Sequence, residues 1–264
     1  TGYVVAGPEQ TIPMTYYYLR EALNTQSPQA VFVELTGMFY ARYTNYTKTN
    51  IGQMPWGINR LLATFREAEP EYRAGLLFPL LFYHDRWSQL TADDFAVTFT
   101  GYEADPLAGY TYLDLYREGG GIYDRELARD EANEARSWVA LTDIYRLLVD
   151  EGIQPVFYVA PGLGRIPAAA MEPLKTRIRT EMPEALVLDC NEHWEEIGAD
   201  ESRDFYDALH YNAAGAEKFS RFLGRLMEEN LPLTPLPGQD AELWQSRADH
   251  FHQLAAQPLT PADS

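Results

Sequence analysis

The residues with the clearest potential for chemistry are an acid and a base three positions apart, Asp207 and His210. With this spacing the carboxylate can accept a hydrogen bond from one imidazole nitrogen while the other nitrogen faces a hydroxyl group. That arrangement fixes the tautomer of the imidazole and stabilises the imidazolium that forms when it removes a proton. The turn at 212–215 then begins a helix. The pattern favours a histidine general base oriented by an aspartate; the alternative is an ordinary surface pair beside a helix N-cap.

Three short apolar runs predict the buried parallel strands that must position this pair. They are continuous rather than alternating, rich in β-branched and aromatic residues, and bounded by turn residues. The runs are Ala30–Leu35, Pro155–Ala160 and Ala185–Asp189, and Tyr3–Ala6 is a candidate fourth strand. Because helical patterns lie between them, the sequence predicts an α/β fold, with helices on both faces of a parallel sheet.

Ligands bind at the carboxyl ends of the strands in such sheets. The loops expected at that edge are Thr36-Gly37-Met38, Pro161–Gly164 and the segment that holds Asp207 and His210. The helices expected around the sheet and beyond it are Met14–Gln26, Trp56–Glu69, Glu131–Glu151, Pro167–Met182, Ala213–Asn230 and Asp240–Ala256.

Two stretches depart from this alternation. The stretch 39–129, about 90 residues rich in Tyr and Trp, is too long for a simple crossover. We expect it to be an insertion that lies over the top of the sheet. Residues 231–264 contain prolines near both ends and are expected to form a surface appendage. The predicted organisation is therefore an α/β domain over residues 1–230, interrupted by the insertion, and a C-terminal appendage.

Composition limits the classes of partner. The chain has 21 Lys and Arg against 39 Asp and Glu, a net charge of −18, which disfavours nucleic acid and anionic lipid as partners. Cys190 is the only cysteine, so no intrachain disulfide is possible. His250 and His252 lack a nearby ligand cluster, and we expect no metal site. No apolar run approaches the roughly 18 residues of a membrane span, so a signal or membrane anchor would lie upstream of Thr1.

The segment Asp204–Ala216 resembles the last block of the SGNH (GDSL-like) hydrolases. It looks closest to the group related to alginate O-acetyltransferases and to the DltD-like teichoic-acid D-alanylation proteins. Two further segments, Thr15–Leu23 and Leu81–Trp87, are similar to that group, and the resemblance spans most of 3–226. It implies a three-layer α/β/α, flavodoxin-like sheet and a Ser-His-Asp acyl-transfer mechanism that uses no metal or organic cofactor.

The resemblance also implies where the remaining site residues would lie. The family carries a Ser nucleophile on the turn after its first strand and oxyanion donors in its next two blocks. Gly7 stands where the second block falls, and the third-block position reads Thr36-Gly37-Met38-Phe39, without the Gly-x-Asn-Asp of the family. No Gly-Asp-Ser turn occurs. If Tyr3–Ala6 is the second strand, the first strand and its Ser lie upstream of Thr1. If it is the first strand, the nucleophile is lost and the protein is a pseudoenzyme. The position of the Tyr-rich helix favours the upstream Ser.

The resemblance implies an O-acyl esterase or acyltransferase that acts on acyl groups, chiefly acetyl, of a cell-envelope polysaccharide or glycan outside the cytoplasm. His210 would be the general base and Asp207 its orienting acid. His84 and Arg86 could line the cleft and hold a hydroxyl-rich or anionic substrate, or could tie the insertion to the sheet. The rival hypothesis is a non-catalytic glycan-binding or envelope-assembly protein on the same fold. Its sugar-stacking residues would be aromatic side chains of the insertion, although side chains of this type more often form core: Tyr40, Tyr43, Tyr46, Trp56, Tyr83 and Trp87.

Overall fold

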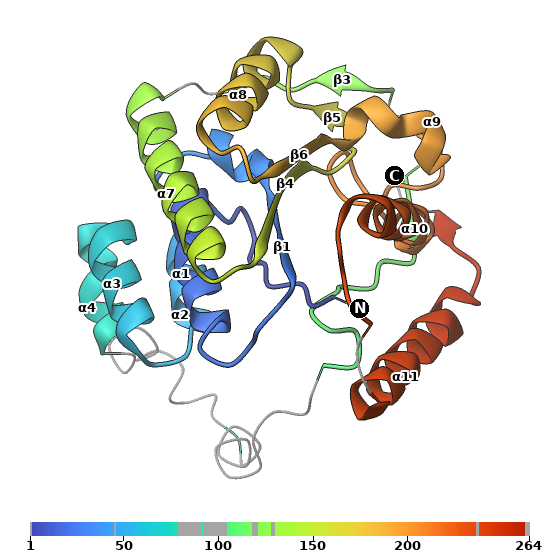
Figure 1. Cartoon of the computed structure of the whole chain (residues 1–264), viewed down its shortest axis with the longest axis horizontal. Coiled ribbons are helices and arrows are strands. Elements are labelled where there is room, and N and C mark those ends of the chain that lie inside the picture. The colour runs from blue at the N-terminus through green and yellow to red at the C-terminus, as the bar shows by residue number, and fades with distance from the viewer. Residues whose placement is uncertain are drawn as a thin grey trace.

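A three-stranded parallel sheet forms the centre of the molecule (Figure 1). The computed structural model describes residues 2–44, 46–78, 91, 105–117, 121–127, 130–235 and 238–261. The strands lie in the order β1 (Ala30–Glu34), β4 (Gln154–Val159) and β6 (Leu186–Asp189). Ala30 pairs with Gln154 and Val156 with Leu186, so the three carboxyl ends meet at one edge. The structure is therefore α/β, and the three predicted strands are confirmed.

Each predicted helix is also present, within a few residues of its expected ends. The helices are α1 (Ile12–Ala22), α2 (Thr47–Gln53), α3 (Ile58–Glu67), α4 (Pro70–Leu77), α7 (Glu131–Asp150), α8 (Ala168–Glu181), α9 (Trp194–Ile197), α10 (Ala213–Asn230) and α11 (Gly238–Ala255). Two 3-10 turns, η1 (Leu35–Phe39) and η3 (Cys190–His193), follow β1 and β6 directly. The remaining strands have two residues each: β2 (Leu115–Tyr116), β3 (Tyr123–Asp124), β5 (Gly164–Arg165) and β7 (Thr260–Pro261).

Helices α1, α7 and α8 cover one face of the sheet. Phe157 and Val33 point into this layer, where they pack with Leu141 of α7 and Ile178 of α8. All four side chains are almost completely buried. Since each fully buried large apolar side chain contributes about 1.5–3 kcal/mol, this layer is the main source of stability. The long α7 begins at Asp130, whose carboxylate accepts the amides of Ala132 and Asn133, and Gly152 ends it with a positive φ of 69°.

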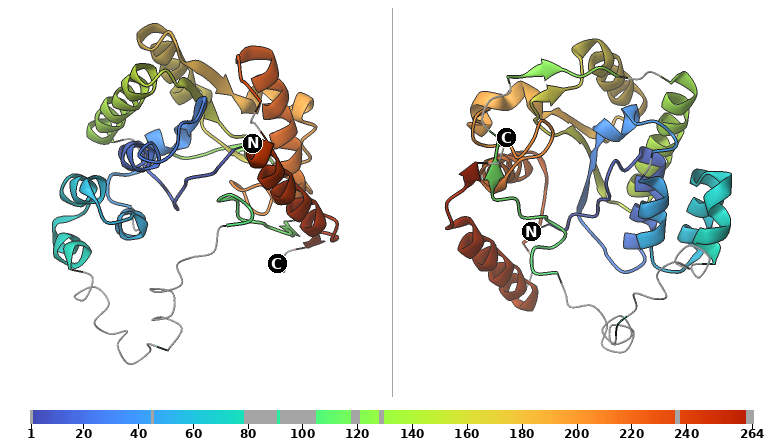
Figure 2. Two further views of the ribbon diagram at one scale, coloured as in Figure 1. Left: turned by 60° about the horizontal axis from the view of Figure 1, so that its bottom comes forward. Right: turned by 180° about the vertical axis from the view of Figure 1, so that it is seen from behind.

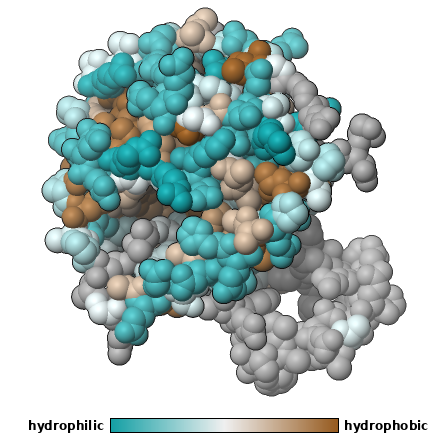
Figure 3. Space-filling view, turned by 90° about the vertical axis from the view of Figure 1, so that its right-hand side faces the viewer, coloured by the Kyte–Doolittle hydropathy of each residue, from teal (hydrophilic) through white to brown (hydrophobic). Residues whose placement is uncertain are grey.

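The other face of the sheet is covered by α10. Cys190 and Phe222 are buried there, and Tyr158 of β4 stacks against Phe219 with ring centroids 6.4 Å apart. Burial raises the pKa of the Cys190 thiol to about 12, so the thiol stays neutral at physiological pH. The outer side of the molecule at α10 and α11 is largely hydrophilic (Figure 3), which agrees with a core that lies inward of both helices.

The candidate strand Tyr3–Ala6 is not a strand. Its residues are exposed and extended, and the amide of Val4 donates to the carbonyl of Ala108 at 2.8 Å. The Arg247 guanidinium of α11 lies 6.0 Å from the centroid of the Tyr3 ring. From the N-terminus near α11, the chain leads toward the sheet without joining it as a strand (Figures 1 and 2). An apolar run forms a strand only when a neighbouring backbone supplies a ladder, and here none of the described strands does so.

The described parts of 39–129 pack in several places. Ile51 of α2, Met54 just after α2 and Ala63 of α3 join a second cluster with Met14 and Tyr17 of α1, and β3 pairs with β5. Farther along, residues 105–117 meet the C-terminal segment. The extent of the insertion as a separate unit stays a prediction.

The C-terminal segment is anchored by aromatic contacts and a short strand pairing. Phe251 of α11 makes edge contacts with Tyr110 and Tyr112, and β7 pairs with β2. None of the helices in the described ranges combines the length and the apolar character needed to cross a lipid bilayer.

Candidate functional site

Asp207 and His210 form a hydrogen-bonded pair. Nδ1 of His210 lies 2.9 Å from Oδ1 and 2.8 Å from Oδ2 of Asp207, so an Nδ1 proton is shared by both carboxylate oxygens. Oδ1 also accepts the amides of Leu209 and His210, each at 2.8 Å. Within the described part of the chain, Nε2 has no hydrogen-bonding partner, and 65% of the His210 side chain is exposed. The geometry is that of a base held by its acid with the second nitrogen facing solvent.

The electrostatics of the pair follow from these bonds. Partial burial acts to raise the pKa of Asp207, but hydrogen bonds from the Leu209 amide and from His210 outweigh it and lower the pKa. Asp207 is therefore ionised at neutral pH. An ionised carboxylate on Nδ1 leaves the lone pair on Nε2, which is the nitrogen that can remove a proton.

The turn that carries the pair is anchored at both ends. The Tyr206 amide donates to the carbonyl of His210 at 2.8 Å, which closes the loop around Asp207. Asn212 caps α10 by accepting the Gly215 amide, and its Nδ2 donates to the carbonyl of Arg203 at 2.6 Å. A buried capping residue thus fixes the start of the helix directly after His210.

The pair lies beside the loop that follows β4. The carbonyl of Ala208 accepts the Gly164 amide at 3.0 Å, and a Cβ on Gly162 would lie 3.5 Å from the same oxygen. Because this loop leaves the carboxyl end of β4, the acid–base pair stands at the edge where open α/β sheets bind ligands. The structure thereby brings together two of the three segments expected at that edge.

The third segment, at the end of β1, holds a partly buried carboxylate. Oε2 of Glu34 accepts the Thr36 amide at 2.8 Å, and Oε1 accepts the Thr36 hydroxyl. Burial raises the pKa of Glu34 to about 6, although hydrogen bonds from Thr36 and the Ala160 amide and the charge of Arg125 act to lower it. Thr36 is therefore held by Glu34. Its role as a substrate-binding residue stays a prediction.

The remaining predicted residues lie apart from the acid–base pair or beyond the described chain. The Gly7 amide donates to Oε1 of Gln10 at 2.9 Å. A Cβ on Gly37 would lie 2.7 Å from the Gln10 carbonyl oxygen, so both glycines meet the segment that leads into α1. Among the described residues, no hydrogen bond joins Gly7 or Gly37 to His210. His84 and Arg86 lie outside the described residues.

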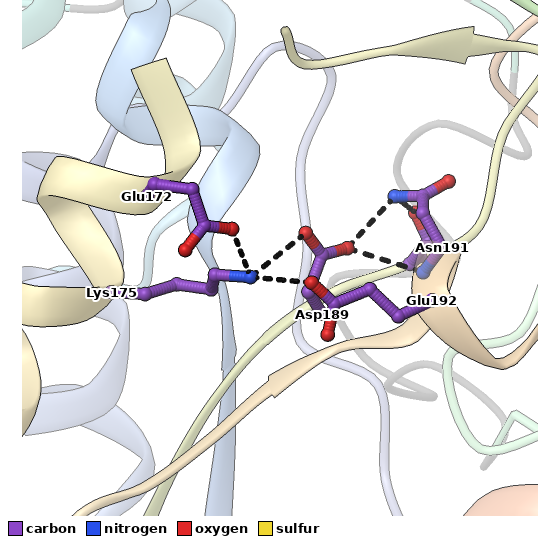
Figure 4. A network of polar contacts seen from close by, with 6 residues as sticks. Glu172, Lys175, Asp189, Asn191 and Glu192 are labelled. Atoms are coloured by element: carbon purple, nitrogen blue, oxygen red, sulfur yellow. Dashed lines mark hydrogen bonds and ion pairs between the residues drawn. The ribbon is translucent and has the colours of Figure 1, made fainter. Parts of the chain in front are cut away.

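Sequence reasoning missed a polar network at the end of β6 (Figure 4). Nζ of the buried Lys175 lies 2.6 Å from carboxylate oxygens of Glu172 and Glu192 and 3.8 Å from Oδ2 of Asp189. Asp189 in turn accepts the backbone and side-chain amides of Asn191 at 3.2 Å. The sequence did contain an indication of this network. A carboxylate and an amide stand at the end of a strand, in Asp189-Cys190-Asn191, and Lys175 interrupts the apolar face of the preceding helix.

No group of three or more His, Cys, Asp and Glu side chains in the described ranges is placed to hold a metal ion. Comparison with known proteins adds no assignment: no family model matches the chain, and no curated protein or solved structure is significantly similar to it. Functional inference therefore rests on the geometry of the site and on the resemblance of Asp204–Ala216.

Proposed function

We propose that the protein is an SGNH-like O-acyl esterase or acyltransferase that acts on acyl groups, chiefly acetyl, of a cell-envelope polysaccharide or glycan. The proposal includes the finer fold assignment, a three-layer flavodoxin-like arrangement, and an extracytoplasmic location. The single observation that carries it is the Asp207–His210 pair, bonded through Nδ1 with Nε2 free at the carboxyl edge of the sheet. A histidine presented in this way serves proton transfer to and from a hydroxyl.

In the proposed reaction, Nε2 of His210 removes the proton of a Ser hydroxyl as the Ser oxygen attacks the acyl carbonyl carbon. The tetrahedral oxyanion collapses, the bond to the sugar oxygen breaks, and imidazolium His210 protonates that leaving oxygen. Water or a second sugar hydroxyl then attacks the acyl carbon of the acyl-enzyme with His210 again as base. The bond to the Ser oxygen breaks, and imidazolium His210 returns the proton to that oxygen. Asp207 stays ionised throughout and stabilises the imidazolium. Gly7, Thr36 and Gly37 would supply oxyanion or substrate contacts.

The proposal requires a Ser nucleophile supplied by a segment upstream of Thr1. Among the described serines, Ser137 is buried inside α7, and Ser202 donates to Oδ1 of Asp200 at 2.6 Å. None of the described serines forms a hydrogen bond with His210. An upstream strand that ends in a small-residue turn holding Ser would complete the triad.

A fluorophosphonate probe tests the proposal on the protein that includes its upstream segment. We expect covalent labelling of one Ser in the wild type and its loss in the His210→Ala variant, because the probe reacts with activated serines. Labelling that persists in His210→Ala would show that His210 does not activate the nucleophile. A wild type that stays unlabelled would exclude the Ser hydrolase.

A glycan-binding function without catalysis is the second candidate, and the exposure of aromatic residues near α2 and α3 favours it. Trp56 is 57% exposed, with the Arg60 guanidinium 4.2 Å from its ring centroid, and Tyr43 and Tyr46 are 41% and 43% exposed. Flat exposed rings of this kind stack on sugars. Retained binding to an envelope polysaccharide by an unlabelled protein, abolished in Trp56→Ala, would support this second function.

A further inference from the structure

Asn191 holds the loop that supports the acid–base pair. It stands in η3, directly after β6, and its side chain reaches across to the loop after β4. Oδ1 accepts the Gly162 amide at 3.3 Å, while Nδ2 donates toward the carbonyl of Ala160 at 3.5 Å. One side chain therefore meets both ends of the segment 160–162. That loop carries Gly164, whose amide donates to the carbonyl of Ala208 between the acid and the base.

The orientation of Asn191 is itself fixed. Oδ1 of Asp189 accepts both the amide and Nδ2 of Asn191 at 3.2 Å, which leaves the Asn191 oxygen pointing toward Gly162. Oδ2 of Asp189 faces Lys175, whose side chain is 3% exposed. The hydrogen bonds that Lys175 donates to the Glu172 and Glu192 carboxylates outweigh burial and raise the pKa of Lys175, which therefore stays charged (Figure 4). The charged Lys175, held by three carboxylates, thus fixes the Asp189 carboxylate, and Asp189 in turn orients Asn191.

We propose that Asn191 is a positioning residue for His210, acting through the loop 160–164 and the carbonyl of Ala208, and that Lys175 maintains its orientation through Asp189. The proposal rests on the proposed function where it assigns an effect on rate. It goes beyond that function because it places a required side chain in η3, directly after β6 and outside the acid–base turn. Exposed catalytic side chains need such support, since small displacements of a base lower rates strongly.

The test begins with amide hydrogen exchange and the ring NMR signals of His210 in the 264-residue chain. Asn191→Ala removes the hydrogen bonds of the Asn191 side chain with Gly162 and Ala160. It should accelerate exchange of the Gly162 and Gly164 amides at least about fivefold and shift the ring signals of His210. Lys175→Met should likewise accelerate amide exchange and shift the His210 ring signals. Lys175→Arg should give exchange rates and ring signals like those of the wild type. If Asn191→Ala does not fold, Lys175→Met carries the same prediction.

Asn230→Ala is the matched control, because Nδ2 of Asn230 donates to the Leu226 carbonyl at the exposed end of α10. It should leave exchange at 160–164 and the His210 signals unchanged. Exchange in Asn191→Ala that stays within about twofold of the wild type would overturn the proposal.

The effect on rate is measured separately, on the complete protein that labels with fluorophosphonate. Asn191→Ala should lower kcat for ester hydrolysis about tenfold or more with KM nearly unchanged. Faster exchange with an unchanged kcat would reduce Asn191 to a structural residue and overturn the positioning role. If the wild type neither labels nor turns over, the proposed function fails, and the exchange rates and His210 signals alone decide whether Asn191 positions the turn.

Discussion

Replacing Glu34 with Gln should make the stability of the protein less dependent on pH. Burial raises the pKa of Glu34 from its ordinary value of 4.5 to about 6. The folded protein therefore favours the protonated carboxyl more strongly than the unfolded chain does. The stability that this group contributes is fully present below pH 4.5 and is lost as the pH rises through 6. A neutral Gln removes this titration while its Oε1 can still accept the Thr36 amide.

The magnitude follows from the two pKa values. A rise from 4.5 to about 6 corresponds to about 2 kcal/mol of unfolding free energy between fully acidic and neutral conditions. Part of that loss has already occurred at pH 5, because the unfolded carboxyl is mostly ionised there. We therefore expect a difference of about 1 kcal/mol between pH 5 and pH 8. Lower pH is unsuitable, because the isoelectric point lies near 4.6.

Urea unfolding at pH 5, 6, 7 and 8, followed by circular dichroism, measures the effect. The quantity of interest is the change in unfolding free energy from pH 5 to pH 8 in the wild type minus the same change in Glu34→Gln. Other titrating groups, Asp207 included, cancel in this difference. Glu228→Gln, an exposed glutamate on α10, is the control and should follow the wild type. Parallel curves for wild type and Glu34→Gln would refute the reasoning and show that the Glu34 carboxyl titrates as it would in water.

Three further predictions concern the acid–base turn and its helix. His210→Ala should abolish turnover but keep the thermal midpoint within a few degrees. The reason is that the His210 side chain is 65% exposed and, among the described residues, is hydrogen-bonded only to Asp207. A large drop of the thermal midpoint in calorimetry would show that His210 is structural. Asp207→Asn should lower kcat by orders of magnitude with little change in KM, and equal changes in steady-state kcat and KM would contradict an orienting role. Gly215→Ala should destabilise the protein by about 1–3 kcal/mol in urea, because its Cβ would lie 2.2 Å from the Asp204 carbonyl oxygen. Gly224→Ala on the same helix meets nothing within 4 Å and should be neutral or stabilising.

Local pattern was sufficient for most of the fold. The runs at Ala30, Pro155 and Ala185 became the three strands because continuous β-branched and aromatic residues favour a strand buried on both faces. Helix α10 has the predicted bounds, since Asn212 caps it and the apolar positions after it repeat at helical spacing. The prediction of a strand at Tyr3–Ala6 is wrong. The composition of this run is that of a strand, but strand formation depends on a neighbouring strand that the local sequence does not specify.

The acid–base pair was visible in the sequence because both groups lie on one short turn, where spacing alone determines that Nδ1 can reach the carboxylate. The sequence by itself thus determined the three strands of the central sheet, the six predicted helices and the local chemistry of Asp207 and His210. Only the tertiary structure decided that Glu34, Asn191 and Lys175 surround the same edge. Glu34 lies in β1, far from the other two residues in the chain. Lys175 and Asn191 are closer in sequence, but the contact of Lys175 with Glu192 and that of Asn191 with Gly162 arise only when α8, η3 and the loop after β4 pack together. Contacts of that kind depend on which segments meet in space, which residue type and spacing do not encode locally.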